Sequence, residues 1–227
     1  NIYVSNFFNI LITMFCPCSD NSKSNSLYKI NHENESKIDV RCTSYNSANL
    51  KHWKPNLFKC TKCSLIFSEY IGVDFEDSYS HVVDEAYINQ IEFKTKTFKL
   101  FFSKIRQYLK HDNDILEIGS YYGILGNIIK PHVKSYMGLE LSKHATRYSK
   151  KKFNLNIINQ SLKEFSKNEF RFDVIIMTDV IEHLDKPFET LNLIQKNLKP
   201  NGILVLSTFN IDSIVPRVMR SKYYWII

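Results

Sequence analysis

The chain has 227 residues, of which 44% are hydrophobic and 23% are charged, and its formal net charge is +7 at pH 7. This size and composition predict one main domain with a full core, plus a small appendage. No stretch approaches the roughly 20 apolar residues of a transmembrane helix, so no membrane span is expected. The lysines are scattered along the chain. Their distribution favours a solvated basic surface over a face built for nucleic acid, although the charge permits such contact.

The cysteines and the start of the chain bear on where the protein works. Five cysteines, an odd number, and the lack of a convincing signal peptide favour a reducing compartment, and we expect a cytoplasmic location. The chain begins at Asn1 rather than at a methionine. One interpretation takes Met14 as the true start and residues 1–13 as an artefact of gene calling. A buried strand and a processed signal remnant are the alternatives.

A C-x-x-C motif at Cys60 and Cys63 indicates a metal site. An apolar, strand-like tail follows it, as in a zinc ribbon, where a tight turn presents two thiolates above the next strand. A redox pair and two ordinary core thiols are the alternatives, and a redox pair would need a βαβ thioredoxin pattern that is absent here. We therefore expect one structural zinc in a zinc-ribbon-like subdomain over residues 14–70.

A tetrahedral zinc site needs a second pair of ligands, and the best candidates are Cys16 and Cys18. Their C-x-C spacing is one residue short of the usual knuckle, so Cys42 and His52 are kept as reserve ligands. The sequence between the two pairs is rich in Asn, Ser, Lys and Glu, which predicts an exposed polar insert.

A leading helix is predicted over residues 84–109, which contain neither glycine nor proline. Apolar residues recur there at helical spacing, namely Ile91, Phe98, Phe101, Phe102, Ile105 and Leu109. Basic residues occupy much of the remaining surface, where a solvated face is favoured over a nucleic-acid site. We expect this helix to pack on a sheet, to close one side of a pocket and to open a second domain over residues 84–227.

The stretch Asp114–Gly126 carries the clearest sign of chemistry. A short apolar run containing Glu117 predicts a buried parallel strand. Three of the six glycines, Gly119, Gly123 and Gly126, then punctuate a turn into a helical pattern over residues 124–129. A strand, a tight glycine turn and a helix N-terminus predict a concave site with free backbone N–H groups, which suits a nucleotide-like ligand.

After this turn, strands and helices alternate along the chain, which predicts a parallel sheet. Strands are predicted at 134–139, 155–158, 172–178 and 203–208, helices at 142–151, 161–165 and 187–198, and a turn at 199–202. Glu140 ends the second strand, about 20 residues beyond the first glycine, where a carboxylate accepts hydrogen bonds from both ribose hydroxyls in doubly wound sheets. A surface glutamate at a strand end is the alternative.

Tyr121 distinguishes two classes of nucleotide ligand. The spacing G-x-x-x-G-x-x-G places Tyr121 where a dinucleotide-binding motif needs its middle glycine. A bulky side chain there blocks the close approach of a pyrophosphate, whereas a nucleoside without phosphates does not need that approach. A ribose-and-adenine ligand is therefore favoured over the cofactor of a dinucleotide-dependent dehydrogenase.

Four motifs in this order resemble the class I S-adenosylmethionine-dependent methyltransferases. They are Ile-Leu-Glu-Ile-Gly-Ser-x-x-Gly at 115–123, Gly-Leu-Glu at 138–140, Phe-Asp-Val-Ile-Ile-Met-x-Asp-Val-Ile-Glu-His-Leu at 172–184 and Leu-Lys-Pro-Asn-Gly-Ile-Leu-Val-Leu-Ser-Thr at 198–208. The ubiquinone-biosynthesis O-methyltransferase group is the most similar, and the cysteine-containing head resembles the zinc ribbon of some members. The resemblance implies an α/β fold with a Rossmann-like, doubly wound, mostly parallel sheet.

The resemblance also implies roles for individual residues. Gly119 and Gly123 would let the backbone approach the methionine part and the ribose of the cofactor, while Glu140 would hold the ribose hydroxyls. The implied cofactor-binding residues are Glu117, Gly119, Ser120, Gly123, Glu140, Leu141, Ser161, Leu162 and Thr178. The implied catalytic residues are Asp179 and His183, and the implied zinc ligands are Cys16, Cys18, Cys60 and Cys63.

Ser161 and His183 leave alternatives open. At Ser161 the family usually has an aspartate facing the adenine amine, and a serine still accepts a hydrogen bond there but offers no charge. His183 is the candidate general base, because an imidazole takes a hydroxyl proton near neutral pH. The alternative is that Glu182 and His183 only order the loop, because methyl transfer from a sulfonium is driven mainly by positioning and by the leaving group.

The expected activity is transfer of a methyl group from S-adenosylmethionine to an oxygen, or else a carbon or nitrogen, of a small-molecule acceptor. Sugar or polysaccharide intermediates and quinone-like phenols are the leading substrate classes. An RNA or protein methyltransferase and a cofactor-binding scaffold without catalysis are the alternatives. Family members add two further strands to complete a seven-stranded sheet, so the chain is expected to be truncated at its C-terminal end.

Overall fold

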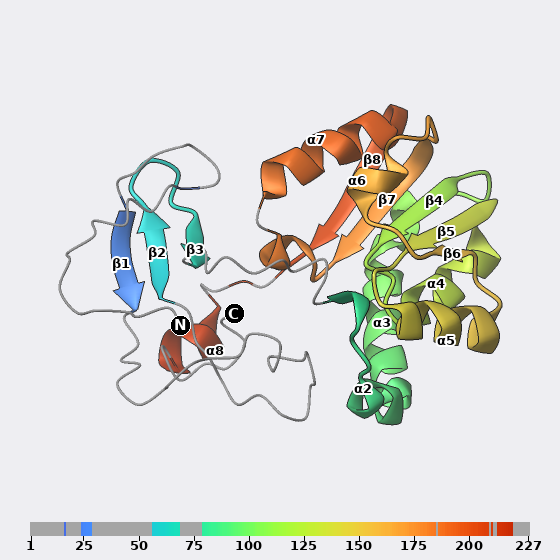
Figure 1. Cartoon of the computed structure of the whole chain (residues 1–227), viewed down its shortest axis with the longest axis horizontal. Coiled ribbons are helices and arrows are strands. Elements are labelled where there is room, and N and C mark those ends of the chain that lie inside the picture. The colour runs from blue at the N-terminus through green and yellow to red at the C-terminus, as the bar shows by residue number, and fades with distance from the viewer. Residues whose placement is uncertain are drawn as a thin grey trace, which may run out of the picture.

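The structure is a computed structural model that describes residue 16 and residues 24–28, 56–68, 79–184, 186–208, 210 and 213–219. Figure 1 shows a small three-stranded sheet and a larger α/β unit. Several predicted features lie outside the described residues, namely the proposed start at Met14, the ligand candidates Cys18, Cys42 and His52, and most of the polar insert.

The small sheet is antiparallel and contains β1 (Ser24–Tyr28), β2 (Leu57–Cys60) and β3 (Ile66–Ser68), with β2 in the middle. A tight turn joins β2 to β3. Its ends are tied by hydrogen bonds from Ser64 N–H to the Cys60 carbonyl (3.1 Å) and from Cys60 N–H to the Leu65 carbonyl (2.9 Å). The predicted strand after the C-x-x-C motif is therefore confirmed as β3.

The larger sheet has five parallel strands in the order β6-β5-β4-β7-β8. These strands are β4 (Asp114–Ile118), β5 (Ser135–Leu139), β6 (Ile157–Ile158), β7 (Phe172–Thr178) and β8 (Leu198–Ser207). The chain proceeds outward from β4 through β5 to β6, then returns to place β7 on the other side of β4. The prediction of a doubly wound parallel sheet is thereby confirmed, and its topological switch point lies between β4 and β7.

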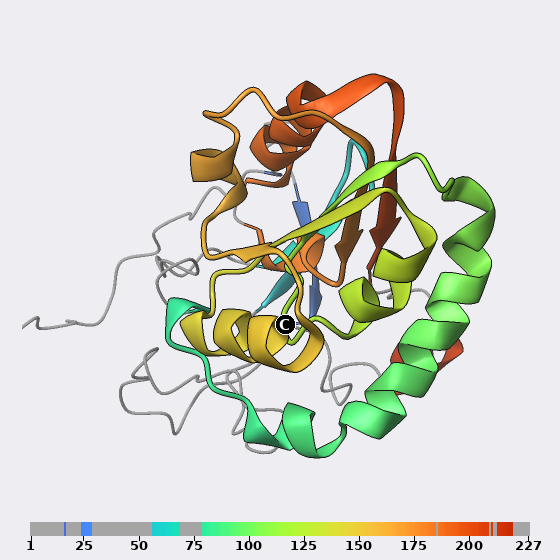
Figure 2. The same ribbon diagram turned by 90° about the vertical axis from the view of Figure 1, so that its right-hand side faces the viewer.

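Helices cover both faces of this sheet (Figure 2). The α-helices are α2 (Glu85–Asn89), α3 (Ile91–Ile105), α4 (Ile124–Ile129), α5 (Lys143–Phe153), α6 (Leu162–Phe165), α7 (Pro187–Asn197) and α8 (Ile214–Met219). Within the described residues, single 3₁₀ turns are found at η2 (Arg106–Tyr108), η3 (Lys130–His132) and η4 (Ile181–His183). The core residues of α3 and α4 pack with Ile115 on one face, whereas those of α6 and α7 pack with Leu116 on the other. The side chains of successive residues of β4 thus point to opposite faces of the sheet and pack into different cores, as strand geometry requires.

The predicted helix over residues 84–109 is wrong in its continuity. The structure divides it into α2, α3 and η2, with a break at Gln90, whose φ and ψ are −101° and 13°. The aromatic residues Phe98, Phe101 and Phe102 of α3 pack on the sheet core, as expected. The start of α2 is held instead by hydrogen bonds to the glycine turn after β4, so the two helices dock on different surfaces.

The predicted turn at 199–202 is also wrong, because these residues belong to β8. Phe172 pairs with Leu198 and Val174 pairs with Ile203, so the intervening residues form an irregularity within the strand. The Lys199 ammonium holds this stretch beside β7 through Asp173, at 2.8 Å. Asn201 absorbs the extra length with a φ of 63°.

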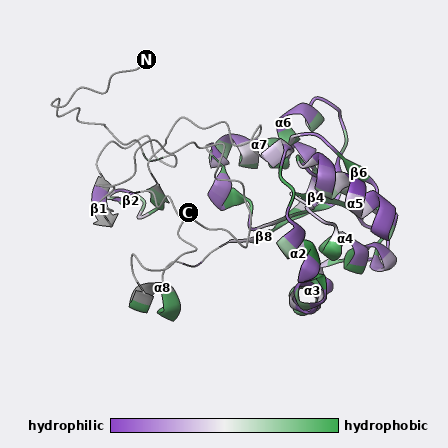
Figure 3. Ribbon diagram, turned by 60° about the horizontal axis from the view of Figure 1, so that its bottom comes forward, coloured by the Kyte–Doolittle hydropathy of each residue, from purple (hydrophilic) through white to green (hydrophobic). Residues whose placement is uncertain are grey.

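The outer surface of α5 is largely polar. The helix α5 buries only the small residues Ala145, Thr146 and Ser149, ends in three lysines and is mainly hydrophilic in Figure 3. No helix among the described residues is long and apolar enough to cross a membrane. Within the described residues β8 is an edge strand of the sheet, and the two further strands expected beyond it stay a prediction.

Candidate functional site

The candidate site lies at the carboxyl ends of β4, β5 and β7, beside the switch point where open α/β sheets bind ligands. The glycine turn follows β4, Glu140 follows β5 and Asp179 follows β7. The glycine turn contacts the residues that follow β5 and β7. Tyr121 N–H donates to Glu140 at 2.7 Å, and a Cβ added at Gly119 would lie 2.5 Å from Val180 Cγ2. The structure therefore brings together the sequence-predicted residues of these three strand ends.

Glu140 is held in a fixed orientation at the end of β5. It is 6% exposed, and its two carboxylate oxygens accept from the N–H groups of Tyr121 and Ser142, both at 2.7 Å. Burial raises the pKa of the Glu140 carboxyl, and these backbone donors oppose the rise. Each oxygen keeps further acceptor capacity, so two neighbouring hydroxyls of a ribose can bind side by side.

Asn159 is a residue that the sequence alone did not single out. Its side-chain amide donates to the carbonyl of Glu140 at 2.8 Å and to the carbonyl of Leu141 at 2.6 Å. It thus fixes the backbone that carries the Glu140 side chain. The only sequence signal was its place just after the strand β6, beside the candidate residue Ser161.

The expectation of free backbone N–H groups is wrong for four donors of the glycine turn. Gly119 and Ser120 both donate to the Leu139 carbonyl, at 2.9 and 3.0 Å. Tyr121 donates to Glu140, and Gly123 donates to the Ser120 carbonyl at 2.8 Å. The turn satisfies these four donors internally because it folds back onto the end of β5. Such a turn cannot cradle a phosphate through these groups, which agrees with a ligand lacking pyrophosphate.

The three positions of the turn require glycine for different structural reasons. Gly119 and Gly123 have φ values of 72° and 76°, in the left-handed region that favours glycine. A Cβ at Gly126 would instead lie 2.3 Å from the ring of Tyr136. Gly126 therefore makes room for a buried tyrosine on β5 rather than for a ligand.

Tyr136 reaches the second buried carboxyl group of the site. Its hydroxyl donates to Glu117 Oε2 at 2.5 Å, and Glu117 is only 2% exposed. Burial raises the pKa of Glu117 to about 8, the Tyr136 hydrogen bond opposes this rise, and the nearby Glu140 adds to it. Glu117 is therefore mostly protonated at neutral pH. Ser120, another predicted site residue, is 4% exposed beside Gly138.

The end of β7 presents Thr178, Asp179 and, after a bend, His183. Asp179 has a φ of 53° and accepts from the Ser207 hydroxyl at 3.1 Å, while its N–H donates to the Ser207 carbonyl. Burial lowers the pKa of His183 to about 4, and the Asp179 charge opposes the fall. His183 is thus neutral at pH 7, and its ring lies edge-on to Tyr79 at a centroid distance of 5.9 Å. It can accept a hydrogen bond, but it is a weak base.

Glu182 has features that the sequence analysis did not attribute to it. The Thr208 hydroxyl donates to Glu182 Oε2 at 3.1 Å. The other oxygen, Oε1, is buried and has no hydrogen-bond partner within the part of the chain that the structure describes. Burial raises the pKa of the Glu182 carboxyl. A buried carboxylate oxygen that accepts no hydrogen bond destabilises the protein alone. Glu182 is therefore a candidate to accept a hydrogen bond from a hydroxyl group of the substrate.

Ser161 and Leu162 begin the helix α6 beyond β6. The Ser161 hydroxyl caps this helix by accepting from Glu164 N–H at 3.3 Å. Ser161 and Leu162 are both more than nine-tenths buried. A hydroxyl that accepts a backbone hydrogen bond still has its own proton to donate. Ser161 can therefore cap α6 and still contact an adenine ring.

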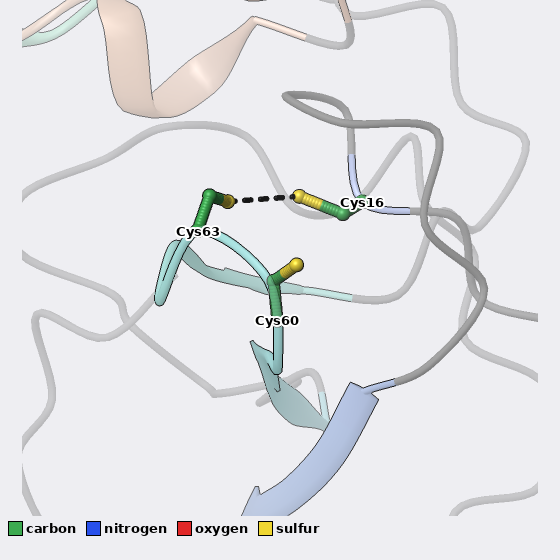
Figure 4. A group of neighbouring side chains, drawn as sticks. All are labelled: Cys16, Cys60 and Cys63. Carbon is green, nitrogen blue, oxygen red and sulfur yellow. Dashed lines mark hydrogen bonds between the residues drawn. The ribbon is translucent and has the colours of Figure 1, made fainter.

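A separate cluster of cysteines combines Cys60 at the end of β2, Cys63 in the turn after it and Cys16 (Figure 4). The sulfur atoms of Cys16, Cys60 and Cys63 lie within 4.8 Å of one another, and Cys16 Sγ is 3.5 Å from Cys63 Sγ. Cys60 Sγ also accepts from Lys62 N–H at 3.3 Å, a donor that favours a thiolate. Tetrahedral zinc–thiolate sites, with Zn–S bonds of about 2.3 Å, require sulfur atoms at this kind of separation. The structure brings together three of the four predicted ligands, and Cys18 lies outside the described residues.

Comparison with known proteins identifies the family. Residues 89–227, more than half of the chain, match a family model described as a methyltransferase domain. The chain belongs to this methyltransferase family. The prediction made from the four motifs is thereby confirmed, and the five-stranded parallel sheet is the Rossmann-like fold of class I methyltransferases.

Curated relatives of this methyltransferase-domain protein carry a common name. This chain is 29% identical over 117 residues to a ubiquinone biosynthesis O-methyltransferase of Rickettsia canadensis, and the match covers 47% of this chain and 49% of the relative. It is 33% identical over 103 residues to the mitochondrial ubiquinone biosynthesis O-methyltransferase of Schizosaccharomyces pombe, covering 42% of this chain and 38% of the relative. The chain thus spans about half or less of the length of these relatives.

Among solved structures, the methyltransferase-domain protein is similar to the plantazolicin methyltransferase BpumL in complex with SAH. The TM-score is 0.50 at 21% identity, and the match covers 62% of this chain and 60% of that chain. At this identity the similarity shows a shared fold.

Proposed function

We propose that this chain is an S-adenosylmethionine-dependent methyltransferase that methylates an oxygen atom of a small molecule. The orientation of Glu140 carries the proposal. Two backbone N–H groups fix its carboxylate at the end of β5, where it can accept from both hydroxyls of a ribose. Membership of the methyltransferase family and the internal pairing of four N–H groups in the turn support a nucleoside cofactor.

The candidate site residues divide into two groups. Glu117, Gly119, Ser120, Gly123, Glu140, Leu141, Ser161 and Leu162 would line the cofactor side, with Thr178 next to the methyl group. Asp179 and His183, at the end of β7, would face the methyl acceptor. The cofactor supplies an activated methyl group on sulfur, and these residues hold the acceptor oxygen in line with it.

The acceptor is proposed to be a phenolic, quinone-like compound, with a sugar intermediate as second choice. The names of the two ubiquinone biosynthesis O-methyltransferases support a phenol.

Isothermal titration calorimetry of the purified chain with S-adenosylmethionine and with SAH, its demethylated product, tests the cofactor. Micromolar binding of both is expected, and no heat with either ligand would remove the proposed function. Transfer of a labelled methyl group to catechols and to sugar nucleotides then tests the acceptor class. Labelling of RNA alone would contradict the small-molecule proposal.

The role of His183 requires its own test. A His183→Ala variant that keeps near-normal turnover with a bound acceptor would end the general-base hypothesis, which the low pKa of His183 already weakens. A Glu182→Gln variant in the same assay asks whether the neighbouring buried carboxyl group contacts the acceptor instead.

The small sheet is proposed to hold one structural zinc ion through Cys16, Cys60 and Cys63, with Cys18 as the fourth ligand. The close approach of three sulfur atoms supports this, and it agrees with a reducing compartment such as the cytoplasm. Elemental analysis should find about one zinc per chain. A Cys63→Ser variant should lose the metal, whereas the control Ser64→Ala should keep it. Zinc well below one equivalent in protein purified without chelators would contradict the site.

A further inference from the structure

Residues 82–84 form a short segment, here called the clasp, that binds the glycine turn from outside. Its centre of contact is Asp84, which is 1% exposed. Asp84 Oδ2 accepts from the Tyr121 hydroxyl at 3.0 Å, and its N–H donates to the Tyr122 hydroxyl at 2.9 Å. Asp84 Oδ1 accepts from Tyr87 N–H at 2.9 Å and so caps α2. One buried aspartate thus joins the start of α2 to both tyrosines of the turn.

The clasp also binds Ser142, whose N–H donates to the second carboxylate oxygen of Glu140. Its Val82 carbonyl accepts from the Ser142 hydroxyl at 2.8 Å. Ser142 is buried, and the same hydroxyl accepts from Ala145 N–H at 3.0 Å to cap α5. The loop between β5 and α5 is therefore fixed by the clasp at the residue next but one to Glu140.

The two residues that the clasp binds are the two that orient the Glu140 carboxylate. Tyr121 N–H donates to one carboxylate oxygen and Ser142 N–H donates to the other, while their side-chain hydroxyls bind the clasp. Each residue thus has its backbone on Glu140 and its side chain on residues 82–84. A shift of the clasp would move both donors of the carboxylate together.

Tyr121 needs such an anchor because its backbone is strained. Its φ of 46° lies in the left-handed region, which is unfavourable for a residue other than glycine. Its ring packs edge-on against Tyr87 of α2 at a centroid distance of 4.7 Å. The hydrogen bond to Asp84 and this ring contact hold the turn in the conformation that points its N–H at Glu140.

We infer that Asp84 is a positioning residue, which holds Glu140 through Tyr121 in the orientation that binds the ribose hydroxyls of the cofactor. This inference rests on the proposed function, because it assigns Glu140 to ribose. It predicts that cofactor affinity depends on the Tyr121 hydroxyl, which donates to Asp84. The dependence should be confined to ligands that carry both ribose hydroxyls.

The test is a double-mutant cycle on SAH affinity, measured by calorimetry and by competition. Tyr121→Phe removes only the hydroxyl, and Asp84→Asn keeps an oxygen to cap α2. Each variant should bind SAH about five-fold more weakly, and the double variant should be no weaker than either one. The 2′,3′-dideoxy analogue of SAH should bind wild type and Tyr121→Phe equally. Tyr148→Phe, which removes a hydroxyl from a neighbouring ring of the same cluster, should bind SAH normally.

Three results would overturn the inference. One is unchanged SAH affinity in Tyr121→Phe and Asp84→Asn. Another is an equal loss of affinity for SAH and for the dideoxy analogue, which would show a general effect on the fold. The third is additive losses in the double variant. Wild-type protein that does not bind SAH would remove the proposed function together with the clasp, whereas normal wild-type binding with unaffected variants would remove the clasp alone.

Discussion

The carboxyl groups at the two ends of the five-stranded sheet have different partners and opposite pKa shifts. At the amino end, the Lys199 ammonium lies 2.7 Å from Asp114 and 2.8 Å from Asp173. Hydrogen bonds from Lys199 and Ser135 lower the pKa of Asp114 to about 2. At the carboxyl end, Glu117 and Glu140 are buried against tyrosine hydroxyl and backbone N–H donors, and burial raises both pKa values.

This difference separates carboxylates that stabilise the fold through ion pairs from buried carboxyl groups that are proposed to face a ligand. The amino-end carboxylates have cationic partners within the protein and join β4, β7 and β8. Within the described residues, no ion pair with Lys or Arg involves Glu117 or Glu140. Burying carboxyl groups without cationic partners is unfavourable for folding, so their retention at the carboxyl end points to ligand binding.

The largest expected effect follows from removing the charge of Glu140. A Glu140→Gln variant should bind SAH roughly 10- to 100-fold more weakly, because hydrogen bonds from ribose to a charged carboxylate are lost. Calorimetry measures the change. Glu92→Gln, at an exposed position of α3, is the matched control and should bind normally. Equal affinity of Glu140→Gln and wild type would break the contrast between the two ends.

The pH dependence of stability should differ in sign between the two ends. Folded Glu117, with a pKa of about 8 against an ordinary 4.5, holds its proton where the unfolded chain has lost it. Its contribution to stability is present below about pH 4.5 and is lost as the pH rises through about 8. Asp114 contributes stability above its ordinary pKa of 3.8, which is lost as the pH falls through about 2.

Urea unfolding at a series of pH values checks these signs. A Glu117→Gln variant should gain stability relative to wild type between pH 5 and about 8. Asp114→Asn should instead be less stable than wild type above pH 3.8 and should approach wild type in acid. A wild-type profile that Glu117→Gln leaves unaltered above pH 5 would show that the carboxyl group is ionised in the folded protein.

A smaller effect is expected from the amino-end ion cluster. Lys199→Met leaves Asp114 and Asp173 without their shared cation and should lower the thermal midpoint by a few degrees Celsius. SAH affinity should stay the same, because Lys199 lies at the opposite end of the sheet. Lys196→Met, at an exposed position of α7, is the control. Weaker SAH binding by Lys199→Met would show that the two ends are coupled.

The smallest expected effect is a gain of affinity at Ser161. A Ser161→Asp variant keeps a capping oxygen for α6 and adds a charge beside the adenine amine, so SAH should bind about three-fold more tightly. Ser161→Asn keeps the cap without the charge and should show no gain. A gain with both variants would indicate improved capping rather than a contact with adenine.

Features set by local sequence could be predicted, and features set by distant contacts could not. The strand β7 was predicted with its observed bounds, because a continuous apolar run ends at polar residues on both sides. The glycine turn, the Ser142 cap of α5 and the position of Glu140 follow similarly from short patterns. The family followed from four such patterns in order.

The internal hydrogen bonds of the turn and the clasp were not predictable in this way. Asp84 and Tyr121 are 37 residues apart, and nothing in either local sequence shows that the two side chains meet. The break at Gln90 has the same origin, because α2 follows the clasp while α3 follows the sheet. The irregularity in β8 depends on Lys199 reaching Asp114, 85 residues away.

The carboxylates without cationic partners have a consequence for turnover. The sulfur of the methyl donor carries a positive charge that the thioether product lacks. In the proposed site, Glu140 and Asp179, neither of which pairs with Lys or Arg among the described residues, would attract the donor more strongly than the product. Methyl transfer itself would weaken the hold on the spent nucleoside, so each reaction would prepare the site to exchange product for fresh donor.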